Sequence, residues 1–173
     1  MGKIVILQGD ITKQRVDAIV NAANCSLLGG GGVDGAIHRA AGPELLKECR
    51  TLGGCSTGEA KITGAYRLDA KYVIHTPGPV WHGGGSGEAE KLSLCYKNSL
   101  RLADEHECKT VAFPSISTGV YHFPLAKASV IAIETIKEYL SAHDGIEEVR
   151  MVCFDGLTYG YYEKALEESG NLS

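Results

Sequence analysis

Two polar side chains flank a run of glycines near the start of the sequence. Asn24 and Asp34 stand on either side of the four consecutive glycines Gly29–Gly32. An amide can orient a sugar hydroxyl, and a carboxylate can orient or deprotonate a water molecule. Glycine lets the backbone approach a bulky group, and the N–H groups at a following helix N-terminus favour phosphate. Together these residues would suit hydrolysis at a ribose that is held by its phosphate groups.

Each of these features also has a simpler interpretation. The glycine run can be a flexible surface loop, and Asp34 can be a helix N-cap. His38, on the same helix face as Asp34, can hold the loop or act as a base. Cys25 lies inside the proposed site and could be a nucleophile, although no Ser-His-Asp or Cys-His order is evident. We favour an anion site, because the sequence Asn-Ala-Ala-Asn directly precedes the glycines.

Other polar segments follow apolar runs that predict strands. Ligands of open α/β sheets bind at the carboxyl ends of strands, so these segments are further candidates. Asp10 can contact a ligand or cap the next turn. The loop Ser115–Pro124 offers the hydroxyls of Ser115, Ser117 and Thr118 beside Gly119, and with the first loop it could grip a pyrophosphate. Phe154 can stack on a nucleobase or be a core aromatic.

The elements that position these residues follow from hydrophobic periodicity. Strands are predicted at Lys3–Leu7, Asp17–Asn21, Ala60–Leu68, Lys71–Thr76, Thr110–Pro114 and Glu148–Phe154. Helices are predicted at Asp34–Ala41, Glu44–Leu52, Glu88–His106, Pro124–His143 and Tyr159–Glu168. Alternating strands and helices predict a layered α/β/α fold. The hairpin formed by Ala60–Leu68 and Lys71–Thr76 predicts a mixed sheet, and His75 at its end is expected to be a packed, hydrogen-bonded histidine.

Composition bounds the partners of the chain. Its 173 residues carry a net charge of −4 and predict one domain, residues 1–173, with a sizeable core. An acidic chain is not expected to bind nucleic acid, and no apolar run is long enough to predict a membrane span. The six cysteines form no Cys-x-x-Cys pair, so we expect reduced thiols, no metal and a cytoplasmic location. Cys95 and Cys153 are expected in the core.

These motifs resemble the macro domain family, specifically its MacroD-type ADP-ribosyl hydrolase branch. The matching stretches are Gly9–Thr12, Asp17–Asn24, Gly29–Gly42, His75–Thr76 with Gly78–Pro79, and Ser115–Tyr121. The resemblance implies a three-layer α/β/α sandwich with a mixed sheet of about six strands, and ADP-ribose as the ligand. Two residues depart from the family pattern, since Pro77 stands in place of a small aliphatic residue and His122 in place of a glycine.

The resemblance also implies roles for individual residues. Asp10 and Ile11 would contact the adenine, and Phe154 would lie against it. Asn24 would hold the distal ribose, and Asp34 would be the catalytic acid. The two walls of the diphosphate cleft would be formed by Gly30, Gly31, Gly32 and Val33 on one side and by Ser117, Thr118, Gly119, Val120 and Tyr121 on the other.

The activity that the resemblance implies is ester hydrolysis at the distal ribose. The expected substrates are O-acetyl-ADP-ribose and proteins that carry mono-ADP-ribose on Asp or Glu side chains, and neither a metal nor a cofactor is required. A module that binds ADP-ribose without turnover is the alternative from another class, and an ADP-ribose 1″-phosphatase is a third. We expect a monomer.

Overall fold

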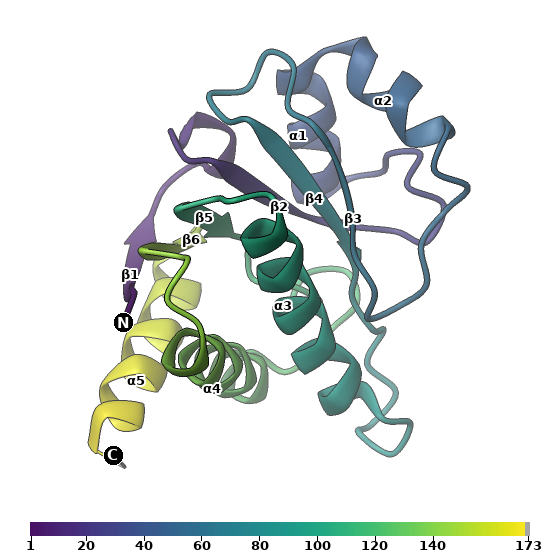
Figure 1. The fold of residues 1–173 in the computed structure, drawn as a ribbon. Coiled ribbons are helices and arrows are strands. Elements are labelled where there is room, and N and C mark those ends of the chain that lie inside the picture. The colour runs from purple at the N-terminus through teal and green to yellow at the C-terminus, as the bar shows by residue number, and fades with distance from the viewer. Residues whose placement is uncertain (172–173) are drawn as a thin grey trace.

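One sheet of six strands lies at the centre of the molecule, in the order β1-β6-β5-β2-β4-β3 (Figure 1). The computed structural model describes residues 1–171. All neighbouring strands pair in parallel except β3 and β4, which are antiparallel, so the predicted mixed sheet is confirmed. The strands are β1 (Lys3–Gln8), β2 (Ala18–Ala23), β3 (Lys61–Gly64), β4 (Tyr72–Pro77), β5 (Thr110–Phe113) and β6 (Glu148–Cys153).

Helices cover both faces of this sheet. They are α1 (Gly32–Ala41), α2 (Pro43–Arg50), α3 (Glu88–Glu105), α4 (Leu125–Ala142) and α5 (Gly156–Asn171), with a short 3-10 helix, η1, at Ile11–Lys13. One core joins the sheet to α3, α4 and α5, and a second joins its other face to α1 and α2 (Figure 1). The expected three-layer α/β/α sandwich is therefore confirmed.

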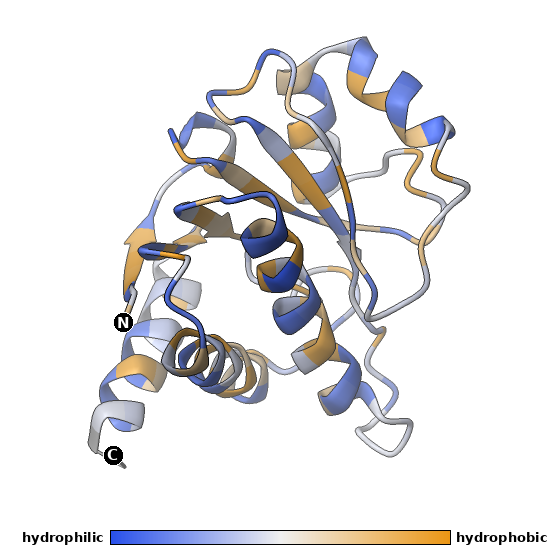
Figure 2. Ribbon diagram, viewed as in Figure 1, coloured by the Kyte–Doolittle hydropathy of each residue, from blue (hydrophilic) through white to orange (hydrophobic). Residues whose placement is uncertain are grey.

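Strand β2 contributes side chains to both cores. Ala18 and Val20 belong to the core under α3 to α5, whereas Ile19 between them belongs to the core under α1 and α2. Successive side chains of a strand point to opposite faces, so a strand covered on both sides must be apolar throughout. Figure 2 shows much of β2 and β4 in the colour of hydrophobic residues, while the helices carry both colours.

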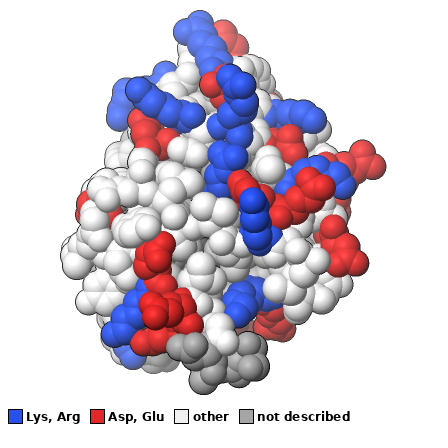
Figure 3. All heavy atoms as spheres, turned by 90° about the vertical axis from the view of Figure 1, so that its left-hand side faces the viewer, with Lys and Arg blue, Asp and Glu red and all other residues white. Residues whose placement is uncertain are grey.

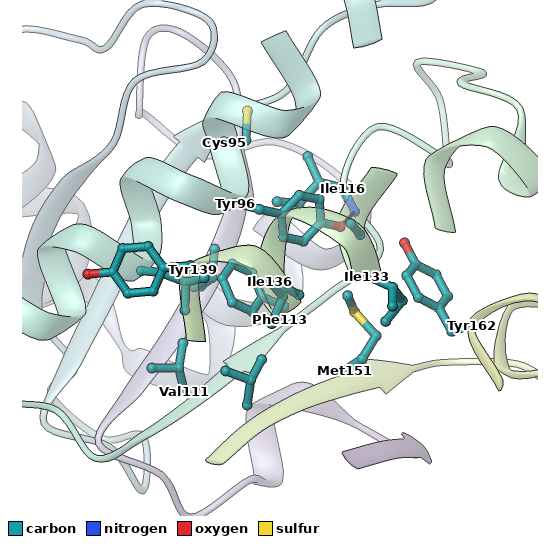
Figure 4. Close-up of a cluster of buried hydrophobic side chains, with 14 of the residues drawn as sticks. Cys95, Tyr96, Val111, Phe113, Ile116, Ile133, Ile136, Tyr139, Met151 and Tyr162 are labelled. Carbon is teal, nitrogen blue, oxygen red and sulfur yellow. Dashed lines mark hydrogen bonds between the residues drawn. The ribbon is translucent and has the colours of Figure 1, made fainter. Parts of the chain in front are cut away.

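The larger core holds the loop that follows β5. Figure 4 shows Tyr96 of α3, Phe113 of β5 and Tyr162 of α5 packed with aliphatic side chains of α4. The hydroxyl of Tyr96 accepts a hydrogen bond from the backbone N–H of Ile116 over 3.2 Å. The hydroxyls of Tyr162 and Ser115 are 2.8 Å apart. Two buried tyrosines thus anchor the start of this loop to the core.

Strands β2 and β5 separate toward their carboxyl ends. They pair only at Ala18 with Val111 and at Ile19 with Ala112, whereas β2 stays paired with β4 as far as Ala23. The chain continues from β2 into α1 on one face and from β5 into α4 on the other. Such a change of direction is the position at which open α/β sheets form a ligand crevice.

Several element boundaries differ from the sequence-based prediction. The largest error concerns the strand predicted at Ala60–Leu68, because β3 ends at Gly64 and Tyr66 adopts a left-handed φ of 55°. A connection of residues 65–71 therefore joins the two strands of the hairpin that was predicted at Ala60–Leu68 and Lys71–Thr76. Helix α5 starts at Gly156, before the predicted Tyr159. Within residues 1–171, no helix is long and apolar enough to cross a membrane.

Candidate active site

The predicted site residues lie along one edge of the sheet. Because β1, β6, β5, β2 and β4 are parallel, their carboxyl ends meet at the same edge, in that order. Asp10 follows β1, Phe154 follows β6, Ser115–Pro124 follows β5, and Asn24 follows β2. The two glycine-containing loops therefore leave the neighbouring strands β2 and β5 at the point where these strands separate.

Asn24 shapes the first loop with its side chain. Its amide nitrogen donates to the carbonyl of Gly29 over 2.8 Å. Its amide oxygen accepts from the hydroxyl of Ser26 at 2.6 Å and from the backbone N–H of Leu27 at 3.1 Å. The loop thus closes on Asn24 at Gly29, which favours the anion site over a flexible surface loop.

The first loop passes directly into α1, and Gly32 and Gly35 are required at this junction. The helix begins at Gly32 with Gly31 as N-cap, two residues before the predicted start, so the alternative that Asp34 is the N-cap is wrong. Gly32 has φ 58°, a conformation that glycine adopts without penalty. A Cβ on Gly35 would lie 2.5 Å from the carbonyl oxygen of Gly30, so only glycine allows the loop to rest on the helix.

The carboxylate of Asp34 is held from inside the protein. Asp34 is only 6% exposed to solvent. Its Oδ1 accepts a hydrogen bond from the amide nitrogen of Asn21 at 2.9 Å and lies 3.4 Å from Nε2 of His38. Its Oδ2 faces the loop, 3.2 Å from the position that a Cβ on Gly30 would take, and Asn24 Nδ2 lies 3.4 Å from the same position. Asn24, Gly30 and Asp34 are therefore brought together as predicted.

A buried polar cluster lies behind Asp34. The amide nitrogen of Asn21 also approaches Nδ1 of His75, at 3.2 Å, and Nε2 of His75 lies 2.9 Å from the hydroxyl of Thr63. Burial, with a smaller contribution from His38, lowers the pKa of His75 to about 3, so this ring is neutral at physiological pH. His75 is thus the packed, hydrogen-bonded histidine that was expected.

The hydroxyl side chains of the second loop, Ser115, Ser117 and Thr118, differ in their hydrogen bonding. Ser115 and Thr118 hydrogen-bond to each other over 2.7 Å, which leaves them less available as the ligand donors that we predicted. Ser117 differs, because its Oγ is buried without a hydrogen-bond partner and its φ is 67°. A Cβ on Gly119 would meet no heavy atom within 4 Å, so the chain leaves open space at this residue.

Gly78, just after β4, fixes the position of the second loop. A Cβ at Gly78 would overlap Oγ of Ser117 and the Cγ2 methyl of Ile116. We expect Gly78→Ala to lower the free energy of unfolding by about 1–3 kcal/mol, the usual effect of overpacking. Chemical denaturation checks this, with Gly85→Ala as control, since a Cβ there meets nothing within 4 Å. Equal loss in both variants would show that the contact with Ser117 does not matter.

The far end of the second loop rests on the segment after β4. The backbone N–H of Trp81 donates to the carbonyl of Tyr121 over 2.9 Å, and the ring of Trp81 lies 4.7 Å from that of Phe123. His122, one of the two departures from the family pattern, has φ 59°, a conformation that glycine adopts more easily. Val120 is 87% exposed at the tip of this loop.

Glu88, at the start of α3, holds the glycine-rich segment that carries Trp81. Its carboxylate accepts backbone N–H groups from His82 at 2.9 Å, Gly84 at 2.9 Å and Ser86 at 2.6 Å. These hydrogen bonds, led by that from His82, lower the pKa of Glu88 to about 2. This glycine-rich segment is therefore anchored at several points.

The other end of the edge carries Asp10, Ile11 and Phe154. Asp10 caps η1, accepting from the N–H of Thr12 at 2.9 Å and from its hydroxyl at 2.7 Å, and these bonds lower the pKa of Asp10. Ile11 is buried. Phe154 is 76% exposed, so the alternative of a core aromatic is wrong. An exposed ring after β6 has a free face for stacking.

The two loops of the site contain no basic side chain, since neither Gly29–Gly35 nor Ser117–Tyr121 includes a Lys or Arg. Arg39 approaches the first loop, with Nη1 3.1 Å from the position of a Cβ on Gly35. Figure 3 shows one face on which basic and acidic side chains lie side by side next to a broad uncharged area. Among residues 1–171, no group of three or more His, Cys, Asp or Glu side chains could hold a metal ion.

Comparison with known proteins supports the family resemblance that the sequence motifs indicated. The family model of the macro domain matches residues 20–132. The chain belongs to the macro domain family. A macro domain-containing protein of Chlorobaculum tepidum is 64% identical over 92% of this chain and 93% of that protein. A protein of Enterobacter cloacae named O-acetyl-ADP-ribose deacetylase is 54% identical over 97% of this chain and 96% of its own length.

Solved macrodomains share the fold of nearly the full length of this chain. The macrodomain of Oceanobacillus iheyensis with ADP superposes with a TM-score of 0.94 at 43% identity, covering 97% of this chain and 92% of that one. The Trypanosoma brucei macrodomain in complex with ADP-ribose gives a TM-score of 0.90 at 44% identity, covering 94% of this chain and 68% of that one.

Sequence reasoning missed three residues that build the site of this macro domain. Asn21 was placed in a strand and in a stretch that matches the family but was given no role, although a polar residue in an otherwise apolar strand is a signal for a buried hydrogen bond. Gly78 was noted only as part of a stretch that matches the family, and Glu88 only as a helix start. Glu88 accepts N–H groups of the loop just before it, and Gly78 makes room for side chains of the distant second loop; the residue types alone do not indicate either contact.

Proposed function

We propose that this macro domain binds ADP-ribose and hydrolyses ester bonds at its distal ribose. O-acetyl-ADP-ribose and ADP-ribose joined to Asp or Glu side chains are the proposed substrates. The observation that carries the proposal is the position of Asp34, whose Oδ1 is fixed by Asn21 while its Oδ2 faces Gly30. A carboxylate fixed in this way can orient a water molecule at the mouth of the loop.

The diphosphate of the ligand is proposed to lie between the two glycine loops. The first N–H groups of α1 are not capped by a side chain, so they remain available for an anion. The proposed contacts of the diphosphate are Gly30, Gly31, Gly32 and Val33 on one side and Ser117, Thr118, Gly119, Val120 and Tyr121 on the other. A diphosphate in this place would put the distal ribose next to Asn24 and Asp34, where the reaction must take place.

The adenine is proposed to lie at the opposite end of the same edge. Oδ1 of Asp10 is occupied by Thr12, so Oδ2 is the atom proposed to accept from the amino group of adenine. The backbone of Ile11 would lie beside the base, and the exposed ring of Phe154 would stack on it. The structure of the Trypanosoma brucei macrodomain in complex with ADP-ribose supports ADP-ribose as the ligand.

Hydrolysis explains the site better than binding alone. A module that only binds ADP-ribose needs the backbone donors and the adenine contacts, but it has no need of a buried carboxylate held by the side chain of Asn21. The name of the Enterobacter cloacae relative supports deacetylation of O-acetyl-ADP-ribose. The same attack by water at an ester would release ADP-ribose from acidic side chains.

One assay separates the three candidate activities. The purified protein is incubated with O-acetyl-ADP-ribose, with a protein that carries ADP-ribose on acidic side chains, and with ADP-ribose 1″-phosphate. We expect turnover of both esters and none of the phosphate. Release of phosphate alone would identify a phosphatase, and tight binding without any turnover would identify a binding module.

Cys25 is expected to take no part in the reaction. Its sulfur is exposed and lies 3.5 Å from the hydroxyl of Thr57, which cannot act as its base. Cys25→Ser should therefore keep most of the turnover, and intact-mass analysis of the working enzyme should find no ADP-ribosyl adduct. Trapping such an adduct on Cys25 would replace water attack by a covalent mechanism.

A further inference from the structure

The buried cluster behind Asp34 forms a continuous chain of hydrogen bonds that starts at the edge strand β3. Thr63 of β3, His75 of β4 and Asn21 of β2 are all buried, and none lies among the proposed ligand contacts. The distances along the chain are 2.9 Å from Thr63 to His75, 3.2 Å from His75 to Asn21, and 2.9 Å from Asn21 to Asp34. Three strands are thus connected to one carboxylate.

The donors and acceptors of these groups allow only one direction of donation along the hydrogen bonds. A carboxylate oxygen can only accept, so Asn21 must turn its amide nitrogen toward Asp34. The same nitrogen faces Nδ1 of His75, which must therefore be the bare, accepting nitrogen of a neutral ring. The proton of His75 is then on Nε2 and is donated to Thr63, whose own hydroxyl donates to the carbonyl of Gly64 over 3.0 Å.

We propose that His75 and Thr63 are positioning residues, which hold the amide of Asn21 with its nitrogen toward Asp34 and so fix the carboxylate for catalysis. The proposal rests on the proposed ester hydrolysis, because it assigns these residues to the same reaction. If the ring carried its proton on Nδ1, two donors would face each other, and the amide would turn its oxygen toward the carboxylate. That orientation repels Asp34 instead of holding it.

One further observation bears on the orientation of Asn21, in which the hydrogen-bond partners lie on the amide nitrogen and not on the amide oxygen. Its amide oxygen is buried and has no hydrogen-bond partner, so the amide is not placed to satisfy its own oxygen. Both contacts of the amide nitrogen are satisfied instead.

The titratable groups that face His75 are His38, with ring centroids 6.4 Å apart, and Cys49, whose sulfur lies 3.8 Å from Nε2 of His75. Burial raises the pKa of Cys49 to about 11, so this neighbour is a neutral thiol.

Two substitutions at position 75 separate the two nitrogens of the ring. An asparagine amide stands at the same bond separation from Cβ as Nδ1, so His75→Asn keeps an acceptor for Asn21. A glutamine amide reaches the position of Nε2, so His75→Gln keeps the contact with Thr63 and loses the one with Asn21. Both variants bury an uncharged amide and remove the ring, so each is the packing control for the other.

The kinetic test compares kcat, KM and the affinity for ADP-ribose of both variants with wild type. We expect His75→Asn to keep kcat within about threefold and His75→Gln to lose about tenfold or more, since small displacements of a reacting group are costly. KM and affinity should stay within about threefold in both, because no ligand contact is removed. Equal losses of kcat, or a loss confined to KM, would overturn the proposal.

The tautomer of His75 gives a test that does not depend on activity. Nitrogen-15 NMR of the imidazole rings, with His75→Asn to assign the signal, should show His75 protonated on Nε2 and bare on Nδ1. A ring protonated on Nδ1 would overturn the proposal even in an active enzyme. Wild-type protein that has this tautomer but hydrolyses neither ester would instead refute the proposed function, and with it the catalytic role of the chain.

Discussion

Asp34→Ala is expected to cut turnover of the ester substrates by about 10²-fold or more while ADP-ribose affinity stays within about tenfold of wild type. The phosphate groups are proposed to be held by backbone N–H groups, which this substitution leaves in place. The carboxylate, in contrast, is the group that faces Gly30 and can orient water. Single-turnover release of product and calorimetric titration with ADP-ribose, on the same preparation, measure the two quantities.

Stability must be separated from catalysis in this experiment. Removing Asp34 leaves the buried amide of Asn21 without its acceptor, which costs about 1–3 kcal/mol. Asp34→Asn keeps a polar group of the same size there and serves as the second variant, while Asp144→Ala, at an exposed position, is the control. Both Asp34 variants should be slow and folded. If they hydrolyse at the wild-type rate, Asp34 serves only the structure of the loop.

The sequence predicted the elements well where the signal is local. The continuous apolar run of β2 and the amphipathic spacing of α3 and α4 are both local patterns, visible in short windows of the sequence. Each predicted strand and helix is present. Their ends differ from the predicted ends mainly where the backbone conformation of one residue, and not the side-chain pattern, sets the boundary. Tyr66 ends the predicted strand early by adopting a positive φ, and Gly31 starts α1 before the carboxylate that resembled a cap.

The candidate site was predictable only in part, for a physical reason. Polar residues that follow strands could be collected at one edge, which brought Asp10, Asn24, Asp34 and Phe154 together. The partners that fix them come from other strands, as His75 and Thr63 show for Asn21. No single-sequence pattern records which buried donor meets which acceptor across a sheet, because that depends on the pairing of β2 with β4 and of β4 with β3.

Gly119→Glu is expected to abolish both ADP-ribose binding and turnover while the protein remains folded. No heavy atom lies within 4 Å of a Cβ at this residue, so a longer side chain does not disturb the core. In the proposed complex, however, the carboxylate would lie against a diphosphate that carries about two negative charges, and like charges at close range repel strongly. Gly119→Ala adds bulk without charge and should lose less affinity.

The comparison needs a matched control and a second condition. Gly160→Glu places the same charge on α5, outside both loops, at another position where a Cβ meets nothing within 4 Å, and it should bind normally. Titrations at low and high salt should change wild-type affinity only modestly, because short-ranged backbone donors are screened less than a field of Lys and Arg. Circular dichroism verifies folding. Near-normal affinity in a folded Gly119→Glu protein would mean that the second loop does not touch the diphosphate, and the shared grip of the two loops would be refuted.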